Sequence, residues 1–196
     1  MPLLLRAVAL WAAITLSMPA ASFSQSVPTL TDSATFTQAT PRRLVEMQFD
    51  MPPAEMVPLL LTRVDLFDPT IAEVRFDHSQ SATPGAFGAG SRRICIFEDG
   101  RELVEPIVLY DPPNAYAYTV DADASTMALP VREIVLIYDF SKTPEGGTAL
   151  SVRAFYDAKI PGTGPVIEPV LTGTLRRTFQ TAVDVFGGTY LGDEKL

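Results

Sequence analysis

The sequence predicts an α+β domain in which a curved antiparallel sheet wraps around a long C-terminal helix. Residues 71 to 158 fall into short strand-like runs separated by Gly, Pro and Asp, which is typical of strands joined by tight turns. After residue 164 the apolar positions recur every three or four residues, which is the period of an amphipathic helix. Such a helix must cover an apolar surface, and the predicted sheet is the large one available.

The first 25 residues have the layout of a secretory signal peptide. Arg6 supplies a positive charge, an apolar run covers residues 7 to 16, and small residues stand at 20 to 22. That run is about half of the roughly 20 apolar residues that a membrane-spanning helix needs. We therefore expect cleavage near residues 21 to 24, a periplasmic or secreted product and no stable membrane insertion after cleavage. A retained N-terminal anchor is the alternative.

Composition limits the partners of the folded part. Fifteen Lys and Arg residues against 23 Asp and Glu give a formal charge of -8, which argues against nucleic acid and anionic lipid surfaces. With one cysteine, Cys95, and one histidine, His78, the chain has no disulfide and no His-rich metal site, and we expect no metal or cofactor. The oligomeric state is left open by the sequence.

Residues 26 to 41, rich in Ser, Thr, Gln and Pro, are expected to be a flexible lead-in to a domain over residues 42 to 192. A strand is expected from Arg43 to Phe49. Asp50 and the prolines after it are expected to start a short helix that runs through Leu61. A second short helical or turn segment is expected around residues 64 to 69.

Six further strands are expected before the long helix. Turn residues at Asp99-Gly100, Pro112-Pro113 and Gly146-Gly147 make three of the connections short, and short connections imply an antiparallel meander. The candidate strands are 71–77, 92–97, 103–110, 115–121, 131–140 and 148–158.

The last element is expected to be one helix of about six turns that Gly187-Gly188 ends or frays. Its apolar stripe consists of Ile167, Leu171, Leu175, Phe179, Ala182, Phe186 and Tyr190.

Several short motifs follow one another in order along residues 42 to 191. They are Gly88-Ala-Gly-Ser-Arg-Arg93, Asp99 to Glu105, Tyr110-Asp-Pro-Pro113, Tyr116-Ala-Tyr118, Leu129-Pro-Val131 and Gly146-Gly-Thr-Ala-Leu150. In order and spacing they resemble the START-like (SRPBCC) superfamily, in the branch described as polyketide cyclase/dehydrase and lipid transport. The resemblance implies the helix-grip (START/Bet v 1-like) fold. Pro106 departs from the family pattern, and because proline cannot donate to a sheet ladder we expect a bulge or a sheet edge there.

The same resemblance implies a cavity between the concave face of the sheet and the helix, because members of the superfamily bind sterols, lipids, hormones or aromatic polyketides there. Its implied partner is a small apolar ligand. By carry-over of an inward-pointing glutamate to Glu105, strand alternation also points Leu109 inward. The implied ligand-binding residues are Arg93, Cys95, Phe97, Leu103, Glu105, Ile107, Tyr118, Phe179 and Val183.

Each of these residues also has a purely structural interpretation. Arg93 and Glu105 form either a ligand-orienting pair or a structural salt bridge. Tyr118 either orients a ligand or packs in the core, and for Phe179 and Val183 core packing is favoured. His78 is either an acid or base at the cavity mouth or a solvated loop residue. Asp121 with Asp123 lacks further calcium ligands, and Gly85, Gly88 and Gly90 precede a strand, so neither group indicates a calcium or phosphate site.

Three functions remain in competition. The first is an exported carrier of a lipid-like or aromatic small molecule. The second is a cyclase or dehydratase in which Glu105, Tyr118 or His78 transfers protons inside the cavity. The third is a protein-interaction module whose cavity has collapsed.

Overall fold

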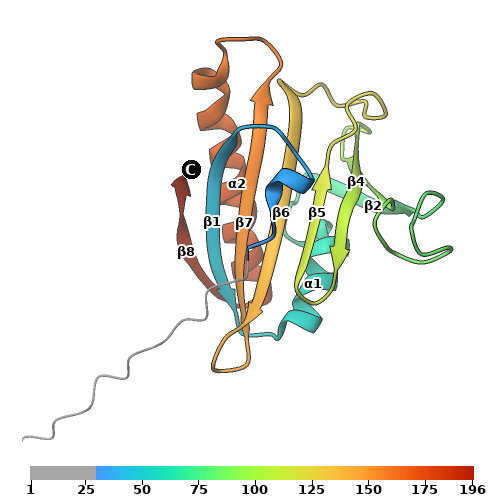
Figure 1. Ribbon diagram of the computed structural model, residues 1–196. Coiled ribbons are helices and arrows are strands. Elements are labelled where there is room, and N and C mark those ends of the chain that lie inside the picture. The colour runs from blue at the N-terminus through green and yellow to red at the C-terminus, as the bar shows by residue number, and fades with distance from the viewer. Residues whose placement is uncertain (1–29) are drawn as a thin grey trace, which may run out of the picture.

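The computed structural model of the protein describes residues 30 to 196, so the expected signal peptide over residues 1 to 25 lies outside the described residues. Figure 1 shows a curved sheet that wraps around one long helix. The elements are η1 (Ser33–Thr35), β1 (Pro41–Phe49), α1 (Pro53–Thr62), η2 (Val64–Leu66), β2 (Ile71–Asp77), β3 (Arg92–Phe97), β4 (Glu102–Asp111), β5 (Ala115–Thr119), β6 (Val131–Lys142), β7 (Thr148–Ala158), α2 (Gly164–Phe186) and β8 (Gly188–Lys195). No helix in this part of the chain is both long and apolar enough to cross a membrane.

The eight strands form one sheet in the order β2-β3-β4-β5-β6-β7-β1-β8, and every neighbouring pair is antiparallel. The meander over β2 to β7 confirms the sequence prediction, since each strand lies beside its successor. The first strand returns to the far side of β7. The α+β helix-grip architecture that the sequence predicted is therefore the fold of the protein.

The short helix α1 begins later than the sequence predicted. Pro52, and not Asp50, is its N-cap, and Pro53 occupies the first turn, where a missing N–H is harmless. The Asp50 N–H instead donates to the carbonyl of Gly187, at the end of α2. Residues Val64–Leu66 form the short helical turn expected after α1.

The main core lies between the concave face of the sheet and the two helices. Met56, Leu60 and Leu61 of α1 and Phe179 and Ala182 of α2 are buried against the inner residues of the strands. A smaller apolar cluster lies on the opposite, outer face of the sheet, with Ala117, Val135, Ile137 and Phe155 at its centre. Both faces of the sheet's central strands are therefore covered.

A bulge in β4 changes which residues face the core. The pairing of β4 with β5 shifts register between Ile107 and Leu109. Because the extra residue reverses the alternation, Val108 and Leu109 both pack against the outer cluster and Tyr110 packs inward. The irregularity expected near Pro106 therefore exists two residues later, and the expectation that Leu109 points inward is wrong.

The C-terminal segment differs from the sequence prediction. The helix ends at Phe186, and Gly187, with a φ of 78°, redirects the chain. Tyr190, expected on the helix stripe, belongs to β8, which pairs with β1 as an eighth strand and runs to Lys195. The residues after Gly187 pair with the free edge of β1, although their apolar positions continue the helical period.

Residues 30 to 40, expected within a flexible lead-in, instead make specific contacts with the outer face of the sheet. The N–H and hydroxyl of Thr31 both donate to Asp139, which also pairs with Arg153. Phe36 and Ala39 pack on the outer apolar cluster. We call residues 30 to 40 the outer strap, because they cross the sheet on the face opposite α2 (Figure 1).

Candidate functional site

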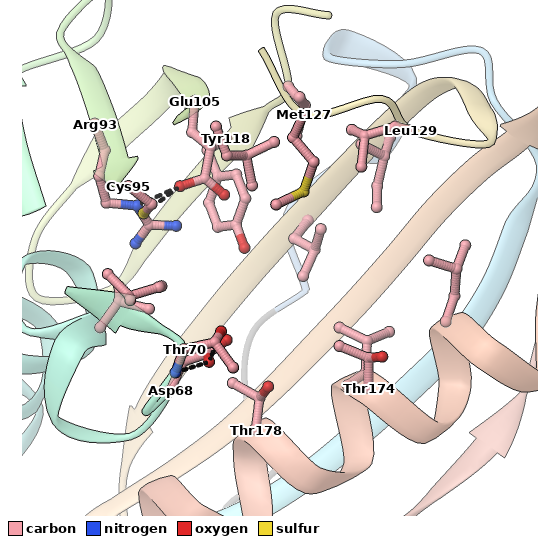
Figure 2. A pocket seen from close by; sticks show the side chains of 18 of the residues that line it. Asp68, Thr70, Arg93, Cys95, Glu105, Tyr118, Met127, Leu129, Thr174 and Thr178 are labelled. Atoms are coloured by element: carbon pink, nitrogen blue, oxygen red, sulfur yellow. Dashed lines mark hydrogen bonds and ion pairs between the residues drawn. The ribbon is translucent and has the colours of Figure 1, made fainter. Parts of the chain in front are cut away.

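A cavity of about 300 Å³ lies between the inner face of β3 to β6 and the helix α2. The segment around η2 and the segment before β6 close its sides. Most of its lining side chains are aliphatic or aromatic. Figure 2 shows Arg93, Cys95, Glu105 and Tyr118 together at one wall, Met127 and Leu129 at another, and Thr174 and Thr178 on the helix.

Arg93 and Glu105 form a buried ion pair in the cavity wall. The two residues are register partners on β3 and β4, and they are 3% and 4% exposed. Arg93 Nε donates to Glu105 Oε2 over 2.7 Å, and Nη1 donates to the carbonyl of Leu61 over 3.0 Å. The guanidinium carbon also lies 4.5 Å from the centre of the Tyr118 ring. The pairing that the sequence predicted is present.

The charges of this pair are held in place by each other. Burial disfavours the charged form of Arg93, but the carboxylate of Glu105 outweighs that effect and raises the pKa of Arg93 above its ordinary value. Since Glu105 is held by a buried cation through Oε2, it is poorly suited to act as a free general base.

Cys95 points into the cavity beside this pair. Its thiol donates to Glu105 Oε2 over 3.3 Å, and burial together with the Glu105 charge raises the pKa of the thiol well above its ordinary value. The thiolate is the nucleophilic form of cysteine, so Cys95 is an unreactive, weakly polar part of the wall.

Tyr118 of β5 and Tyr138 of β6 extend the polar wall, and Tyr116 of β5 packs behind them in the core. The Tyr118 and Tyr138 hydroxyls lie 3.5 Å apart, and the Tyr116 and Tyr138 rings stack with centroids 4.3 Å apart. Burial raises the pKa of all three, that of Tyr138 to about 12. These hydroxyls therefore stay protonated at neutral pH, and those of Tyr118 and Tyr138 share a hydrogen bond at the cavity wall.

The helix supplies the facing wall. Phe179, predicted from the stripe, lines the cavity, and so do Leu171 and Leu175. Thr174 and Thr178, which sequence reasoning missed, also line it. Their spacing of three and seven residues from Leu171 was the available signal, because it places them on the cavity-facing side of the helix.

Sequence reasoning also missed the segment before β6. Met127 and Leu129 point into the cavity in Figure 2, although neither belongs to a strand or a helix. Periodicity gives no information about such a loop, so nothing in the pattern could have assigned their direction.

Four of the predicted strand residues line the cavity beside Glu105 and Tyr118: Arg93, Cys95, Phe97 and Leu103. Ile107 and Val183 do not line it. Both are buried in the main core, Ile107 at 1% exposure, and they touch protein on all sides. Seven of the nine predicted residues therefore border the cavity, and the two exceptions face inward but lie in the packed core.

His78 is not at the cavity mouth. Its Nδ1 lies 2.9 Å from the hydroxyl of Ser91, its ring stacks on Phe76, and its ring meets the edge of Phe87. These contacts explain its position as packing at the end of β2. The suggestion that His78 transfers protons within the cavity is therefore wrong in its placement.

Across residues 30 to 196, no three His, Cys, Asp or Glu side chains are arranged to hold a metal ion. Asp121, one of the two aspartates with a chelate-like spacing, accepts hydrogen bonds from Arg92 and from the N–H of Ala124. Its carboxylate therefore closes a turn.

Comparison with protein-family models and with curated proteins gives no match. Solved structures do match. The structure of Ara h 8.0201 superposes with a TM-score of 0.54 at 15% identity, over 74% of this chain and 98% of that one. XoxI from Bacillus cereus superposes with a TM-score of 0.55 at 13% identity, over 75% of this chain and 96% of that one. Norcoclaurine synthase from Thalictrum, solved with a transition state analogue, superposes with a TM-score of 0.53 at 15% identity, over 74% of this chain and 93% of that one.

These likenesses and the geometry of sheet and helix agree on one class. The protein has the helix-grip fold of the START-like and Bet v 1-like proteins, as the sequence motifs indicated. At identities this low the likeness defines the fold, and the argument for function rests on the cavity itself.

Proposed function

We propose that the protein binds and carries a small, largely apolar molecule in the cavity between the sheet and α2. The observation that carries this proposal is an interior space of about 300 Å³ with mainly aliphatic and aromatic walls and a polar patch at Arg93, Glu105 and Tyr118. Small-molecule sites have this composition, and this volume is at the lower end of their usual range. An apolar cavity of roughly 150 Å³ is already large enough to hold benzene.

The polar patch indicates the chemistry of the ligand's polar end. Arg93 and Glu105 already compensate each other, so a ligand charge placed beside this pair would have no opposite charge left to meet in that wall. Both contacts from Arg93 and Cys95 go to Glu105 Oε2, which leaves Oε1 as an acceptor. The hydroxyl of Tyr118 is a nearby donor. A neutral hydroxyl or amide fits this wall better than a carboxylate or an ammonium group.

We also propose that the protein acts outside the cytoplasm. The support is the sequence of residues 1 to 25, with one early arginine, a short apolar run and small residues before the expected cleavage site. N-terminal sequencing of the purified protein tests this part: a mature chain should begin between residues 21 and 26. A chain that begins at Met1 and is recovered from the cytoplasmic fraction would contradict it.

The alternatives have less support from the geometry. A cyclase or dehydratase needs a free acid or base, but Glu105 is engaged by Arg93 and His78 lies elsewhere. Burial raises the pKa of Tyr118, which makes its hydroxyl a weak acid at neutral pH. An interaction module with a collapsed cavity does not account for the space between α2 and the sheet.

Isothermal titration with 1-hexanol, 1-hexylamine and hexanoate tests the proposal directly. The alcohol should bind more tightly than either charged compound and should raise the melting temperature further as its concentration increases above the Kd. Native mass spectrometry of protein purified from its own host should show a bound molecule. The proposal fails if none of the three compounds binds and the purified protein carries no small molecule.

A further inference from the structure

Exposed apolar side chains gather where the chain enters α2. Ile160, in the segment before the helix, is 65% exposed, and Val166 and Val170, in its first turns, are 74% and 66% exposed. Single exposed aliphatic residues are common, but neighbouring ones on a surface are typical of a binding region. The core does not explain these three residues, because none of them packs in it.

The helix links these valines to the cavity. Thr174 lines the cavity and is exposed, so the cavity reaches the surface at this point. Val170 and Val166 stand four and eight residues before Thr174, which places them on successive turns of the same flank of α2. An apolar stripe therefore leads from the opening along the outside of the helix.

The opposite side of the opening is apolar as well. Met127 and Leu129 line the cavity from the segment before β6. The N–H of Lys159 donates to the carbonyl of Pro130 over 2.9 Å, which places the segment that carries Ile160 beside the one that carries Leu129. Both segments lie at the upper end of the sheet in Figure 1.

The distribution of polar groups gives this path a direction. Arg93, Glu105 and Tyr118 lie at the wall of β3 to β5, whereas the path to the surface passes Met127, Leu129 and Thr174 (Figure 2). A cavity of about 300 Å³ is roughly two benzene-sized spaces. A molecule with its polar end at the ion pair and a long alkyl chain has no room to stay inside.

We propose that the ligand is a neutral amphiphile whose tail leaves the cavity beside Thr174 and lies on Val170 and Val166. This inference rests on the proposed function and adds the class of ligand and a second, external part of the site. The exposed stripe is thereby assigned to the ligand's tail, and not to a membrane or a second protein molecule.

Titration calorimetry with 1-hexanol and 1-decanol on the purified protein tests the inference. Each methylene removed from water should strengthen binding roughly three- to four-fold, so decanol should bind on the order of 100-fold more tightly than hexanol. V170Q should weaken decanol binding about ten-fold and hexanol binding less than two-fold. V185Q is the matched control, because Val185 is exposed on the same helix but lies 15 residues after Val170, at the other end of α2 from the opening.

The outcomes separate the inference from the function beneath it. If hexanol binds but decanol binds no more tightly, the external site is overturned and the cavity function is kept. The same holds if V170Q and V185Q weaken decanol binding equally. Failure of hexanol to bind overturns both. A V170Q variant with unchanged alcohol binding but altered oligomeric state, or altered binding to phosphatidylcholine vesicles, would assign the stripe to a protein or membrane contact and overturn the inference.

Discussion

The ion pair of Arg93 and Glu105 is the residue-scale feature on which the site depends. A buried pair is weak evidence of stabilisation, since removing two charges from water offsets most of their attraction. Here each partner also has a further contact, Arg93 with the carbonyl of Leu61 and Glu105 with Cys95. The pair thus ties the end of α1 to the wall of the cavity, and it gives an apolar space one polar side.

Removing one partner should be far more damaging than replacing both. Glu105→Ala leaves Arg93 charged and buried, so it should lower the free energy of unfolding by about 3–5 kcal/mol. The double variant Arg93→Met/Glu105→Leu should regain most of that loss while binding 1-hexanol more weakly than the wild type. Urea unfolding and calorimetry measure the two effects. A double variant that binds hexanol as well as the wild type would make the pair purely structural.

Single residues also show what a sequence can predict about a cavity. Strand alternation placed Arg93, Cys95 and Phe97 on the inner face, and all three line the space. Alternation also placed Ile107 there, and the resemblance placed Val183 of the helix there, but neighbouring side chains fill the volume around both. Alternation reports which face a residue occupies, whereas the location of empty volume depends on the sizes of all side chains around it.

At the scale of elements, β8 holds the helix against the edge of the sheet. Asp193 of β8 accepts two hydrogen bonds from Arg176 of α2, at 2.8 and 3.0 Å, and one from the Tyr190 hydroxyl. Arg43 of β1 lies 3.5 Å from Asp193, and its Nε donates to Thr172 of α2. The buried residues of α2 are Thr172, Phe179, Ala182 and Val183, and only Thr172 lies in its first half. Polar contacts therefore hold the first half of the helix, whereas apolar packing holds the second.

Asp193→Asn should loosen the first half of α2. Because Arg176 is half exposed, the loss of stability should be about 1 kcal/mol, and amide exchange over residues 168 to 176 should accelerate. Glu73→Ala is the control, since it removes an equally short but exposed pair with Arg75. Equal effects of the two substitutions would argue against a role of Asp193 in holding α2.

The same contact predicts an acid sensitivity. The hydrogen bonds from Arg176 hold the pKa of Asp193 below its ordinary value, so the folded state binds this proton less readily than the unfolded state. Its contribution is therefore complete above the ordinary aspartate value of roughly 3.9 and is lost as the pH falls through the lower folded-state value. Asp193→Asn should remove this part of the acid-induced loss of stability.

The outer strap is ordered, although its composition predicted flexibility. Ser-, Thr- and Gln-rich sequence predicted flexibility, but Thr31 meets a carboxylate, Asp139, that is fully buried in the outer face. Two apolar residues, Phe36 and Ala39, cover the cluster around Phe155. A few well-placed contacts fix the strap, and they have no period that a sequence pattern could reveal.

Asp139→Ala should release the strap and leave Arg153 without its carboxylate partner. We expect a loss of about 3 kcal/mol in the free energy of unfolding, because one partner of a buried pair is removed. Limited proteolysis should then cleave between residues 30 and 40, where the wild type resists. An unchanged cleavage pattern would show that apolar contacts alone hold the strap.

At the scale of the whole molecule, the cavity follows from the mismatch between a curved sheet and a single helix. The concave face has more apolar surface than α2 can cover, and the fold leaves the remainder as space between them. The order of elements predicted this architecture correctly, since a meander followed by an amphipathic helix has few ways to bury both. The eighth strand was missed because Tyr190 and the residues around it continue the helical period.

Filling this space should separate the three candidate functions. Thr178 lines the cavity from α2, and Thr178→Phe should occupy it, abolish 1-hexanol binding and keep or slightly raise the melting temperature, because the new ring replaces empty volume with contacts. Thr181→Phe is the matched control, since Thr181 lies on the same helix away from the cavity lining. A carrier loses its ligand through the first substitution only, and an enzyme loses turnover with it. A surface-binding module retains its partner in both variants, and that result would turn attention from the cavity to the surface.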